Sequence, residues 1–590
     1  MHARPGLPIS APQDFAARPE PCKFNTGPTN RGYNVLSMQS ARCALILTCL
    51  LLLHGCASIP SAGIDGPDKD KLPANGGLVA VQVVTNSAHL TDVLVNWTEV
   101  IVVKEGSVGK NGEPELFSLP ALDDGLTSTR VFVGVLAPGR YRFGGLFSYA
   151  RSDDRTYMLS AGAPRTVGTF DVQTDRLTNL GTVLFQPFHP DPLANTAVLA
   201  PTETPYAMSR IDDSQSLAEF VAAKYPKQFE RTKAVEALGW LADKETDARS
   251  HLAKAIHGFA FMEKPRYVSK EEILYTARLG SLYRRSASGQ WTIGHLPTNL
   301  ALISATKLSD GSYVAGGERG TVWHADSFDA PWQPAALPYA GQSTAWLGEA
   351  DGKLFAIGMD NGKARLYQRS ADWTWAPVGE YGTKVKEGTR ELAYDYDLAP
   401  RVVIRGKELL VYDDHSRYRF DAGTAKLSKI DDQGSFLVQQ QPNGIVVSNA
   451  DSFWFGGVGA PQISRDGGMT WEPYHRLGKW GGALYVFADG TPMAIDSDIG
   501  FGWKGWEKEA HPSVLISSDK GKTQRAIGQV AFGCNRIEGQ ISTDELLYLY
   551  CFDGSLLKST DRGRSWVPEY SRAVRADRLP AEFLGPKAKK

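Results

Sequence analysis

Three copies of one octapeptide constrain the fold of this chain more than any other feature. Residues 464–471 have the pattern S/T-x-D-x-G-x-T-W; residues 559–566 have Ser at the seventh place, and residues 517–524 have Gln at the eighth. Each copy follows a short apolar run. The pattern predicts a tight turn between antiparallel strands, because Ser and Asp side chains bond the turn's own amides and Gly accepts positive φ. We call these octapeptides the box turns. Their structural residues are Ser464, Asp466, Gly468, Trp471, Ser517, Asp519, Gly521, Ser559, Asp561, Gly563 and Trp566.

The box turns belong to a longer repeat over residues 271–575. Seven marker residues recur at spacings of 41, 43, 45, 51, 53 and 42: Trp291, Trp332, Trp375, Phe420, Trp471, Gln524 and Trp566. Repeats of about 40–50 residues with about four short strands each predict the blades of a β-propeller. Seven markers predict seven blades, and six or eight are the alternatives. We expect the ring to close by pairing strands from both ends of the repeat, because an open edge strand invites aggregation.

On these turns and this repeat, residues 271–575 resemble the BNR/Asp-box superfamily, which includes sialidases, sortilin-type receptors and photosystem assembly factors. The resemblance implies the fold and leaves the function open. Sialidases carry an Arg-Ile-Pro motif, an arginine cluster that binds the substrate carboxylate, a Tyr nucleophile assisted by a Glu, and an Asp that acts as general acid/base. Here Arg536-Ile537 is followed by Glu538. We therefore predict no catalytic residues, metal site or cofactor, with a sialidase-like glycoside hydrolase as the alternative.

Residues 38–56 have the order of a secretory signal: a charged start, an apolar run and small residues at the end. The run is shorter than the roughly 20 residues that span a bilayer. Leu53-His54-Gly55-Cys56 resembles a bacterial lipobox, although His54 departs from it. The resemblance implies that Cys56 becomes the first residue and carries fatty acyl chains such as palmitate, and Ala57 after it implies the outer membrane. The alternative is an ordinary signal cleaved nearby, with Cys56 incidental.

The remaining boundaries follow from composition and apolar spacing. We expect 1–37 to be a misassigned extension before a start at Met38, 57–76 a flexible tether, 77–200 a β-sandwich-like domain, 201–270 a helical connector, 271–575 the propeller and 576–590 a polar tail. Residues 135–143 resemble the L-x-P-G-x-Y-x-F segment of small bacterial β-sandwich domains. In the connector, helical spacing joins Leu238 to Leu241 and Leu252 to Ile256. The connector is either a spacer or a partner-binding arm.

Only Cys534 and Cys551 remain in the body that follows the signal. They lie on two strand-like runs that could be neighbours. In an oxidising compartment two cysteines favour one disulfide, and two buried free thiols are the alternative.

The fifth and sixth repeats are lengthened between their second and third strands, at 455–460 and 499–508. Propeller geometry places these connections opposite the box turns. Trp503, Lys504 and Trp506 are the candidate ligand-binding residues, because Trp offers a flat amphipathic surface for a sugar ring or a protein partner. The alternative is that both Trp side chains pack over the blade edges.

A net charge of −1 predicts no nucleic-acid partner. Together these features predict a mainly β, non-enzymatic lipoprotein of the bacterial outer membrane. It is anchored through Cys56, and its propeller binds an envelope protein or a glycan as scaffold, receptor or assembly factor. A lectin-like carbohydrate-binding module is the second alternative.

Overall fold

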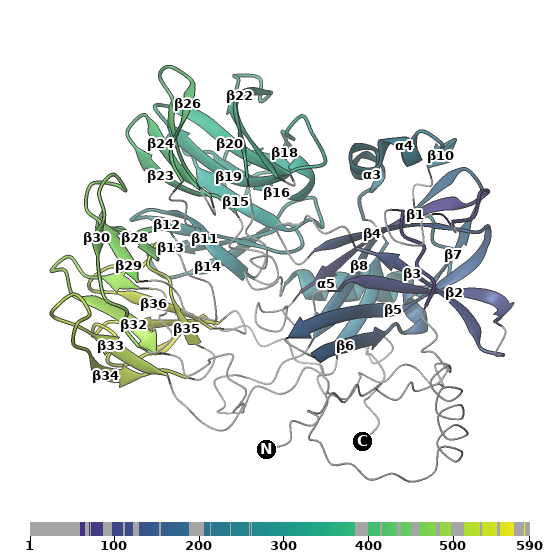
Figure 1. Ribbon diagram of the computed structural model, residues 1–590, viewed down its shortest axis with the longest axis horizontal. Helices are drawn as coiled ribbons and strands as arrows, with labels where there is room; N and C mark the ends of the chain where they lie inside the picture. The colour runs from purple at the N-terminus through teal and green to yellow at the C-terminus, as the bar shows by residue number, and fades with distance from the viewer. Residues whose placement is uncertain are drawn as a thin grey trace, which may run out of the picture.

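The chain is mainly β in a computed structural model, and its described parts form two bodies that lie side by side (Figure 1). We call described residues from 59 to 258 the N-terminal unit and those from 262 to 570 the ring. The structure describes residues 59–64, 70, 72–86, 97–109, 112–121, 129–152, 155–187, 206–212, 214–235, 238–258, 260, 262–360, 362–383, 399–413, 416–432, 438–449, 460–478, 484–496, 512–531, 534–551, 555–570 and 583.

The N-terminal unit has two five-stranded sheets with one apolar core between them. Its strands are β1 (Gly77–Thr85), β2 (Glu99–Val108), β3 (Pro114–Pro120), β4 (Arg130–Leu136), β5 (Gly139–Ser152), β6 (Arg155–Gly162), β7 (Thr169–Val172), β8 (Arg176–Pro187), β9 (Tyr206–Ile211) and β10 (Ala234–Val235). One sheet has the order β10-β8-β1-β4, with β9 also on β8; the other has β3-β2-β5-β6, with β7 also on β5.

Strand β1 is the centre of its sheet, parallel to β8 and antiparallel to β4. Every residue of this strand is buried. Val81 and Val83 point into the core between the sheets, whereas Ala80 and Val84 point to the opposite face, where the helices and the ring cover them. Burial on both faces explains why the strand is mostly apolar without alternation, with buried Gln82 interrupting the apolar run.

Residues 60–64 join the free edges of the two sheets. The Ser118 amide of β3 donates to the Pro60 carbonyl at 3.0 Å, and the Ala62 amide donates back to the Ser118 carbonyl at 2.8 Å. On the other side, the Val135 amide of β4 donates to the Ala62 carbonyl at 2.9 Å. The segment thereby satisfies backbone groups that both edge strands would otherwise leave unpaired.

This segment differs from the flexible tether predicted for 57–76. Ala62 is 3% exposed and Ile64 is 8% exposed. A Cβ on Gly134 would lie 2.9 Å from the Ala62 carbonyl oxygen, so a glycine in β4 makes room for the segment. The composition of 57–76 suggested a solvated chain, but the two sheet edges supply backbone partners that composition does not reveal.

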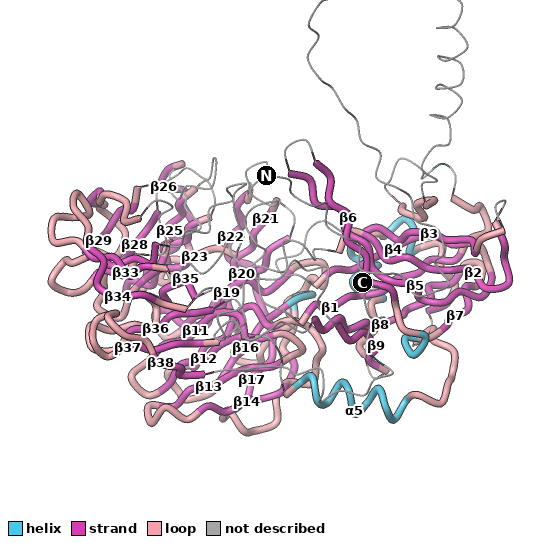
Figure 2. Tube along the Cα trace, turned by 90° about the horizontal axis from the view of Figure 1, so that it is seen from below, coloured by secondary structure: helices cyan, strands magenta, loops and turns pink. Residues whose placement is uncertain are grey.

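Three α-helices are described: α3 (Ala218–Lys224), α4 (Pro226–Phe229) and α5 (Thr246–His257). All three lie within the predicted connector, 201–270, and Leu252 and Ile256 of α5 are buried as the spacing predicts. The same stretch also contains β9 and β10, which extend the N-terminal sheet. Figure 2 shows α5 at the boundary between the two bodies. The connector is thus largely part of the N-terminal unit.

No helix forms at Leu238 and Leu241, contrary to the spacing argument. Trp240, between them, makes an isolated bridge with Phe170 of β7 and stacks edge-on against its ring at 5.7 Å. The Leu241 amide donates to the Thr169 carbonyl at 2.8 Å. Tertiary contacts with the sheet therefore override the local periodicity.

The ring contains seven four-stranded antiparallel sheets among its described residues, each built from four consecutive strands. The first three sheets are β11 (Met262–Val268), β12 (Glu272–Ala277), β13 (Ser281–Ser286), β14 (Trp291–His295); β15 (Leu302–Lys307), β16 (Tyr313–Gly317), β17 (Val322–Ala325), β18 (Gln333–Pro334); and β19 (Ser343–Ala350), β20 (Lys353–Asp360), β21 (Lys363–Arg369), β22 (Trp375–Gly382).

The other four sheets follow the same order. They are β23 (Arg401–Arg405), β24 (Glu408–Tyr412), β25 (Arg417–Asp421), β26 (Lys426–Asp431); β27 (Gln439–Gln440), β28 (Val446–Asn449), β29 (Pro461–Ser464), β30 (Glu472–Pro473); β31 (Tyr485–Val486), β32 (Pro492–Asp496), β33 (Ser513–Ile516), β34 (Arg525–Gln529); and β35 (Cys534–Ile537), β36 (Leu547–Cys551), β37 (Leu556–Ser559), β38 (Val567–Tyr570).

Each sheet packs on the next, and the last packs on the first. An apolar cluster with buried side chains from both sheets fills every one of these interfaces. Examples in order are Leu282 and Ala315, Val314 and Ala356, Phe355 and Phe420, Val403 and Val446, Val447 and Ala494, Val514 and Leu549, and Tyr548 and Tyr283. Face-to-face packing of four-stranded sheets in a closed cycle is the arrangement of a β-propeller.

The cycle closes through side chains. Trp291 of the first sheet lies 4.7 Å from Tyr570 of the last, measured between ring centroids. Beside them, Arg285 forms an ion pair with Glu569 at 2.6 Å. The expected pairing of strands from the two ends is not found among the described strands, because β11–β14 and β35–β38 are each complete sheets. The first and last sheets are instead held together by side-chain packing between their faces.

The predicted marker residues occupy one position throughout the ring: the interface with the preceding sheet. Trp375 is buried there and its indole nitrogen donates to the Ala335 carbonyl at 2.7 Å. Gln524, which replaces Trp in one box turn, instead accepts from the Gly478 amide at 2.7 Å. The other markers pack in the apolar clusters: Trp291, Trp332, Phe420, Trp471 and Trp566.

Cys534 and Cys551 lie directly opposite each other on β35 and β36, and their sulfur atoms are bonded. Both are fully buried in the cluster between the sixth and seventh sheets. The bond links the innermost two strands of the last sheet.

Replacing both cysteines (C534S/C551S) should lower the free energy of unfolding by about 2–4 kcal/mol, as is typical when a native disulfide is lost. The measurement is the guanidinium midpoint of the unfolding transition, with wild type in the presence and absence of reductant as the control. Identical midpoints for all three samples would show that the disulfide contributes nothing to the ring.

Candidate functional site

The box turns are closed hydrogen-bond networks. In the first, the Ser464 hydroxyl accepts from the Gly468 amide at 2.7 Å and donates to Asp466 at 2.7 Å. The Asp466 carboxylate also accepts from the Thr470 amide at 2.9 Å and from its hydroxyl at 2.6 Å. Gly467 and Gly468 take φ of +71° and +92°, which suits glycine. These bonds engage the turn's own donors, so the turn serves the fold.

The other two turns repeat this pattern. Ser565, in the place of Thr, still donates its hydroxyl to Asp561 at 2.6 Å. In the third turn, bonds from the Thr523 amide and then the Ser517 and Thr523 hydroxyls lower the pKa of Asp519 to about 2. At Asp561, burial raises the pKa, but hydrogen bonds led by those of Ser565 outweigh it and lower the value to about 2.

The glycine of each box turn lies against the preceding sheet. A Cβ on Gly468 would lie 2.1 Å from the Tyr412 hydroxyl, and one on Gly563 would lie 2.7 Å from the Met493 sulfur. The left-handed backbone and this close approach both require glycine. The turns therefore set the spacing between neighbouring sheets.

Residues 370–375 form a shorter turn of the same kind, which the sequence pattern of the box turns does not predict. Asp372 accepts from the Thr374 hydroxyl at 2.8 Å, as in the box turns. Trp373 takes a φ of +63° and stacks on His324 with 3.6 Å between ring centroids. The sequence S-x-D-x-T-W retains the Ser, Asp, Thr and Trp but lacks the two residues x-G, so the full pattern does not find it.

The predicted ligand-binding residues Trp503, Lys504 and Trp506 lie outside the described residues, and so does Cys56. By connectivity the first three fall between β32 and β33, the second and third strands of the sixth sheet. Connections of this kind leave a sheet at the end opposite its box turn, because the third strand joins the two. We call the end with second-to-third-strand and sheet-to-sheet connections the docking face, and the other end the box face.

The N-terminal unit covers part of the docking face. Residues of α3 and the segment before it contact the first three sheets of the ring, each time at a connection of the docking face. The contacts are Gln215 with Thr298 at 2.9 Å, Ser216 with Arg319 at 3.3 Å, and the ion pair of Lys224 with Asp360. The Lys224 and Asp360 side chains are 11% and 23% exposed. Partial burial strengthens this pair relative to a surface pair.

Helix α5 adds the apolar part of the same contact. Leu252 and Ile256 share one cluster with Val84 of the N-terminal sheet and with Leu279 at a connection of the first ring sheet. Figure 1 shows α5 between the two bodies. The cluster continues into the interface between the last and first ring sheets, so the N-terminal unit packs where the ring closes.

A buried arginine fixes α5 to the N-terminal unit. The Arg249 side chain is fully buried; it pairs with Asp212 at 2.7 Å and with Asp243 at 2.7 Å. Its guanidinium also donates to the Thr166 carbonyl at 3.0 Å. Arg210 pairs with the same two carboxylates. Satisfied partners on all sides are what a buried charge requires, so this cluster is structural.

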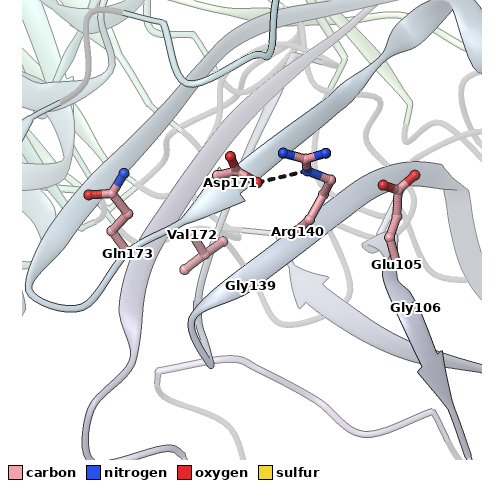
Figure 3. A pocket seen from close by; sticks show the side chains of 7 residues that line it. All are labelled: Glu105, Gly106, Gly139, Arg140, Asp171, Val172 and Gln173. Atoms are coloured by element: carbon pink, nitrogen blue, oxygen red, sulfur yellow. Dashed lines mark hydrogen bonds and ion pairs between the residues drawn. The ribbon is translucent and has the colours of Figure 1, made fainter.

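A hollow of about 590 Å³ lies on the N-terminal unit (Figure 3). It is lined by Glu105, Gly106, Gly139, Arg140, Asp171, Val172 and Gln173. Arg140 pairs with Asp171 at 3.1 Å, with 56% and 39% of the two side chains exposed. Apart from Val172, the side chains that line the hollow are polar or charged, and the exposed pair adds little binding energy.

Tyr and Arg are the residue types that a sialidase-type site needs, and three such side chains of the ring have other contacts. The Tyr367 hydroxyl donates to Gln342 at 3.2 Å, and Tyr418 donates to the Gly382 carbonyl at 3.3 Å. Arg369 lies over the Trp373 ring at 4.3 Å. In the described part of the chain, no three His, Cys, Asp or Glu side chains are grouped to hold a metal ion. Nor does any described helix have the length and apolarity to cross a membrane.

No protein-family model matches the sequence, and no curated protein matches it. Several solved structures are similar in fold. YCF48 bound to D1 peptide is 14% identical with a TM-score of 0.33, covering 46% of this chain and 82% of that one. BamB from Moraxella catarrhalis is 14% identical with a TM-score of 0.32, covering 50% and 84%.

The β-propeller domain of the Trilobed protease from Pyrococcus furiosus is 10% identical with a TM-score of 0.31, covering 53% of this chain and 96% of that one. It is described as having an open velcro topology. All three are β-propeller proteins. Likenesses this distant agree with the fold and carry no statement about function.

The lowered pKa values of the box-turn aspartates predict acid sensitivity. Their ionised form stabilises the fold above the ordinary pKa of about 3.9, and this contribution is lost as pH falls toward about 2. The variant D466N/D519N/D561N should melt lower than wild type at pH 7, and its melting temperature should fall less between pH 5 and pH 2.5. The exposed Asp329→Asn serves as control. Parallel curves for the triple variant and wild type would contradict the role assigned to the turns.

Reversing one charge of the Lys224–Asp360 pair should loosen the contact between the two bodies. We expect K224E to speed hydrogen exchange in α3 and K224E/D360K to restore it, because the double variant restores attraction. K233E breaks the exposed Lys233–Asp175 pair within the N-terminal unit and should leave α3 unchanged. Equal exchange in all variants would show that the ion pair does not hold the docking contact.

Proposed function

We propose that this protein is a non-enzymatic lipoprotein of the bacterial cell envelope whose ring binds a protein partner on the docking face of its fourth to seventh sheets. The observation that carries the proposal is that the same face already binds protein: the N-terminal unit covers it at the first three sheets through α3 and α5. A ring repeats one geometry, so we expect the same end of the fourth to seventh sheets to be open to a second protein surface.

We further propose a fold type for each body and a cellular location for the protein. The ring is a seven-bladed propeller of the Asp-box type, supported by seven consecutive four-stranded sheets and three saturated box turns. The N-terminal unit is a β-sandwich, supported by two sheets around one core. The signal at 38–56, the lipid on Cys56 and the outer-membrane location rest on the sequence alone.

The polar character of the intramolecular contact indicates the kind of partner. Gln215, Thr298, Lys224 and Asp360 combine hydrogen bonds and an ion pair with an adjoining apolar cluster. Polar contacts around an apolar centre are typical of protein–protein interfaces. A folded envelope protein therefore suits this face better than a small molecule, which needs a concave pocket.

Site-specific photocrosslinking in intact cells tests the proposal. Asp432, with a side chain 79% exposed, lies at the docking face where the fourth sheet connects to the fifth. A photoreactive residue at 432 should capture one envelope protein, and one at Met469, exposed on the box face, should not. Indiscriminate capture from both positions, or none from 432, would contradict the proposal; glycan-array binding by the same protein would then favour a lectin-like function.

A further inference from the structure

The body of the protein begins very close to its proposed lipid anchor. Pro60 is hydrogen bonded to β3, and only four residue steps separate it from Cys56. A fully extended chain of four residues spans at most about 14 Å. If Cys56 carries the lipid, as the proposed function requires, the N-terminal unit cannot move far from the bilayer surface.

The direction of the chain shows which end of the unit faces the membrane. Residues 60–62 run parallel to β3, with Ser61 bridging Ser118. The chain before Pro60 therefore points toward the start of β3, at Pro114. Four strand residues from Ser118 back to Pro114 cover about 13 Å, nearly the reach of the four steps to Cys56. An extended chain from Pro60 to Cys56 would therefore reach the level of the tip of the β2–β3 hairpin.

We propose that the tip of the β2–β3 hairpin, around Val108, is the surface that lies against the lipid bilayer in which Cys56 is anchored. Val108 pairs with Pro114 at this tip and is 68% exposed, more than any other large apolar side chain in the described part of the chain. A β-branched apolar residue at an exposed hairpin end is unfavourable in water, and contact with lipid removes that cost.

The described residues on both sides of the hairpin turn are hydrogen bonded to each other. The Gly109 amide donates to the Glu113 carbonyl at 2.7 Å, and the Gly112 amide donates to the Gly109 carbonyl at 3.0 Å. Glu105 and Glu113 are exposed beside Val108. Residues 104–113 contain two Lys and two Glu, a net charge of zero, so the short tether and the apolar tip hold the contact, and it should be insensitive to salt.

Contact of the β2–β3 hairpin with the bilayer places the ring away from the membrane. Both views show the β2–β3 end of the N-terminal unit on the side away from the ring (Figures 1 and 2). The N-terminal unit then acts as a spacer between the bilayer and the ring.

Fluorescence quenching by lipid tests the inference. The full-length lipidated protein, as V108C labelled with an environment-sensitive fluorophore, is reconstituted in phosphatidylcholine vesicles containing nitroxide-headgroup lipid. The matched control is V567C, which is 51% exposed on the ring. Cys534 and Cys551 are disulfide-bonded and do not react with the label. We expect loss of fluorescence at position 108, unchanged in high salt, and none at position 567.

A variant with a longer tether provides the second test in the same quenching experiment. A Gly/Ser insert of about 15 residues between Ser58 and Ile59 extends the reach of the chain without touching the hydrogen-bonded segment. Quenching at position 108 should then fall toward the control value while flotation with vesicles persists. Flotation without quenching at 108 in the native-length protein overturns the inference and leaves the anchor intact. Absence of acyl mass on Cys56 together with loss of flotation overturns the anchor and the inference with it.

Discussion

The packing of each four-stranded sheet against its two neighbours is the interaction on which this structure depends. A single sheet has two apolar faces and is too small to bury either alone; seven in a cycle bury all of them. The marker residues and the box-turn glycines lie at the same interfaces. The marker side chains fill the space between two sheets, and the glycines allow the turn to approach the preceding sheet closely. Local turn chemistry and long-range packing therefore favour one arrangement.

The N-terminal unit depends on the same closure. Its helix α5 packs on the cluster between the last and first sheets, where Tyr283 and Tyr548 are buried together. Arg249 holds that helix to the N-terminal unit through its ion pairs with Asp212 and Asp243. The helix therefore links the core of the N-terminal unit to the core of the ring through buried contacts. The polar contacts of α3 then extend the attachment to the third sheet.

The sequence was informative wherever the physical cause was local. The marker spacing predicted repeats of about four short strands, and the S-x-D-x-G-x-T pattern predicted the bonds of Asp466 and Asp519. It was uninformative where the cause was distant: Trp240 meets Phe170, and Ala62 meets the edges of β3 and β4, through contacts that no periodicity encodes. The candidate residues Trp503, Lys504 and Trp506 were chosen from the length of their repeat and their residue types, and they lie outside the described residues.

Closure by side chains also has a consequence for the order in which the chain is made. The first sheet exposes Tyr283 and Trp291 until the last strand, ending at Tyr570, has been added, because no earlier strand can substitute for it. During synthesis the nascent ring is therefore an incomplete arc with an exposed apolar side. Until its final residues arrive, the unfinished arc exposes apolar surface through which it can associate with other chains.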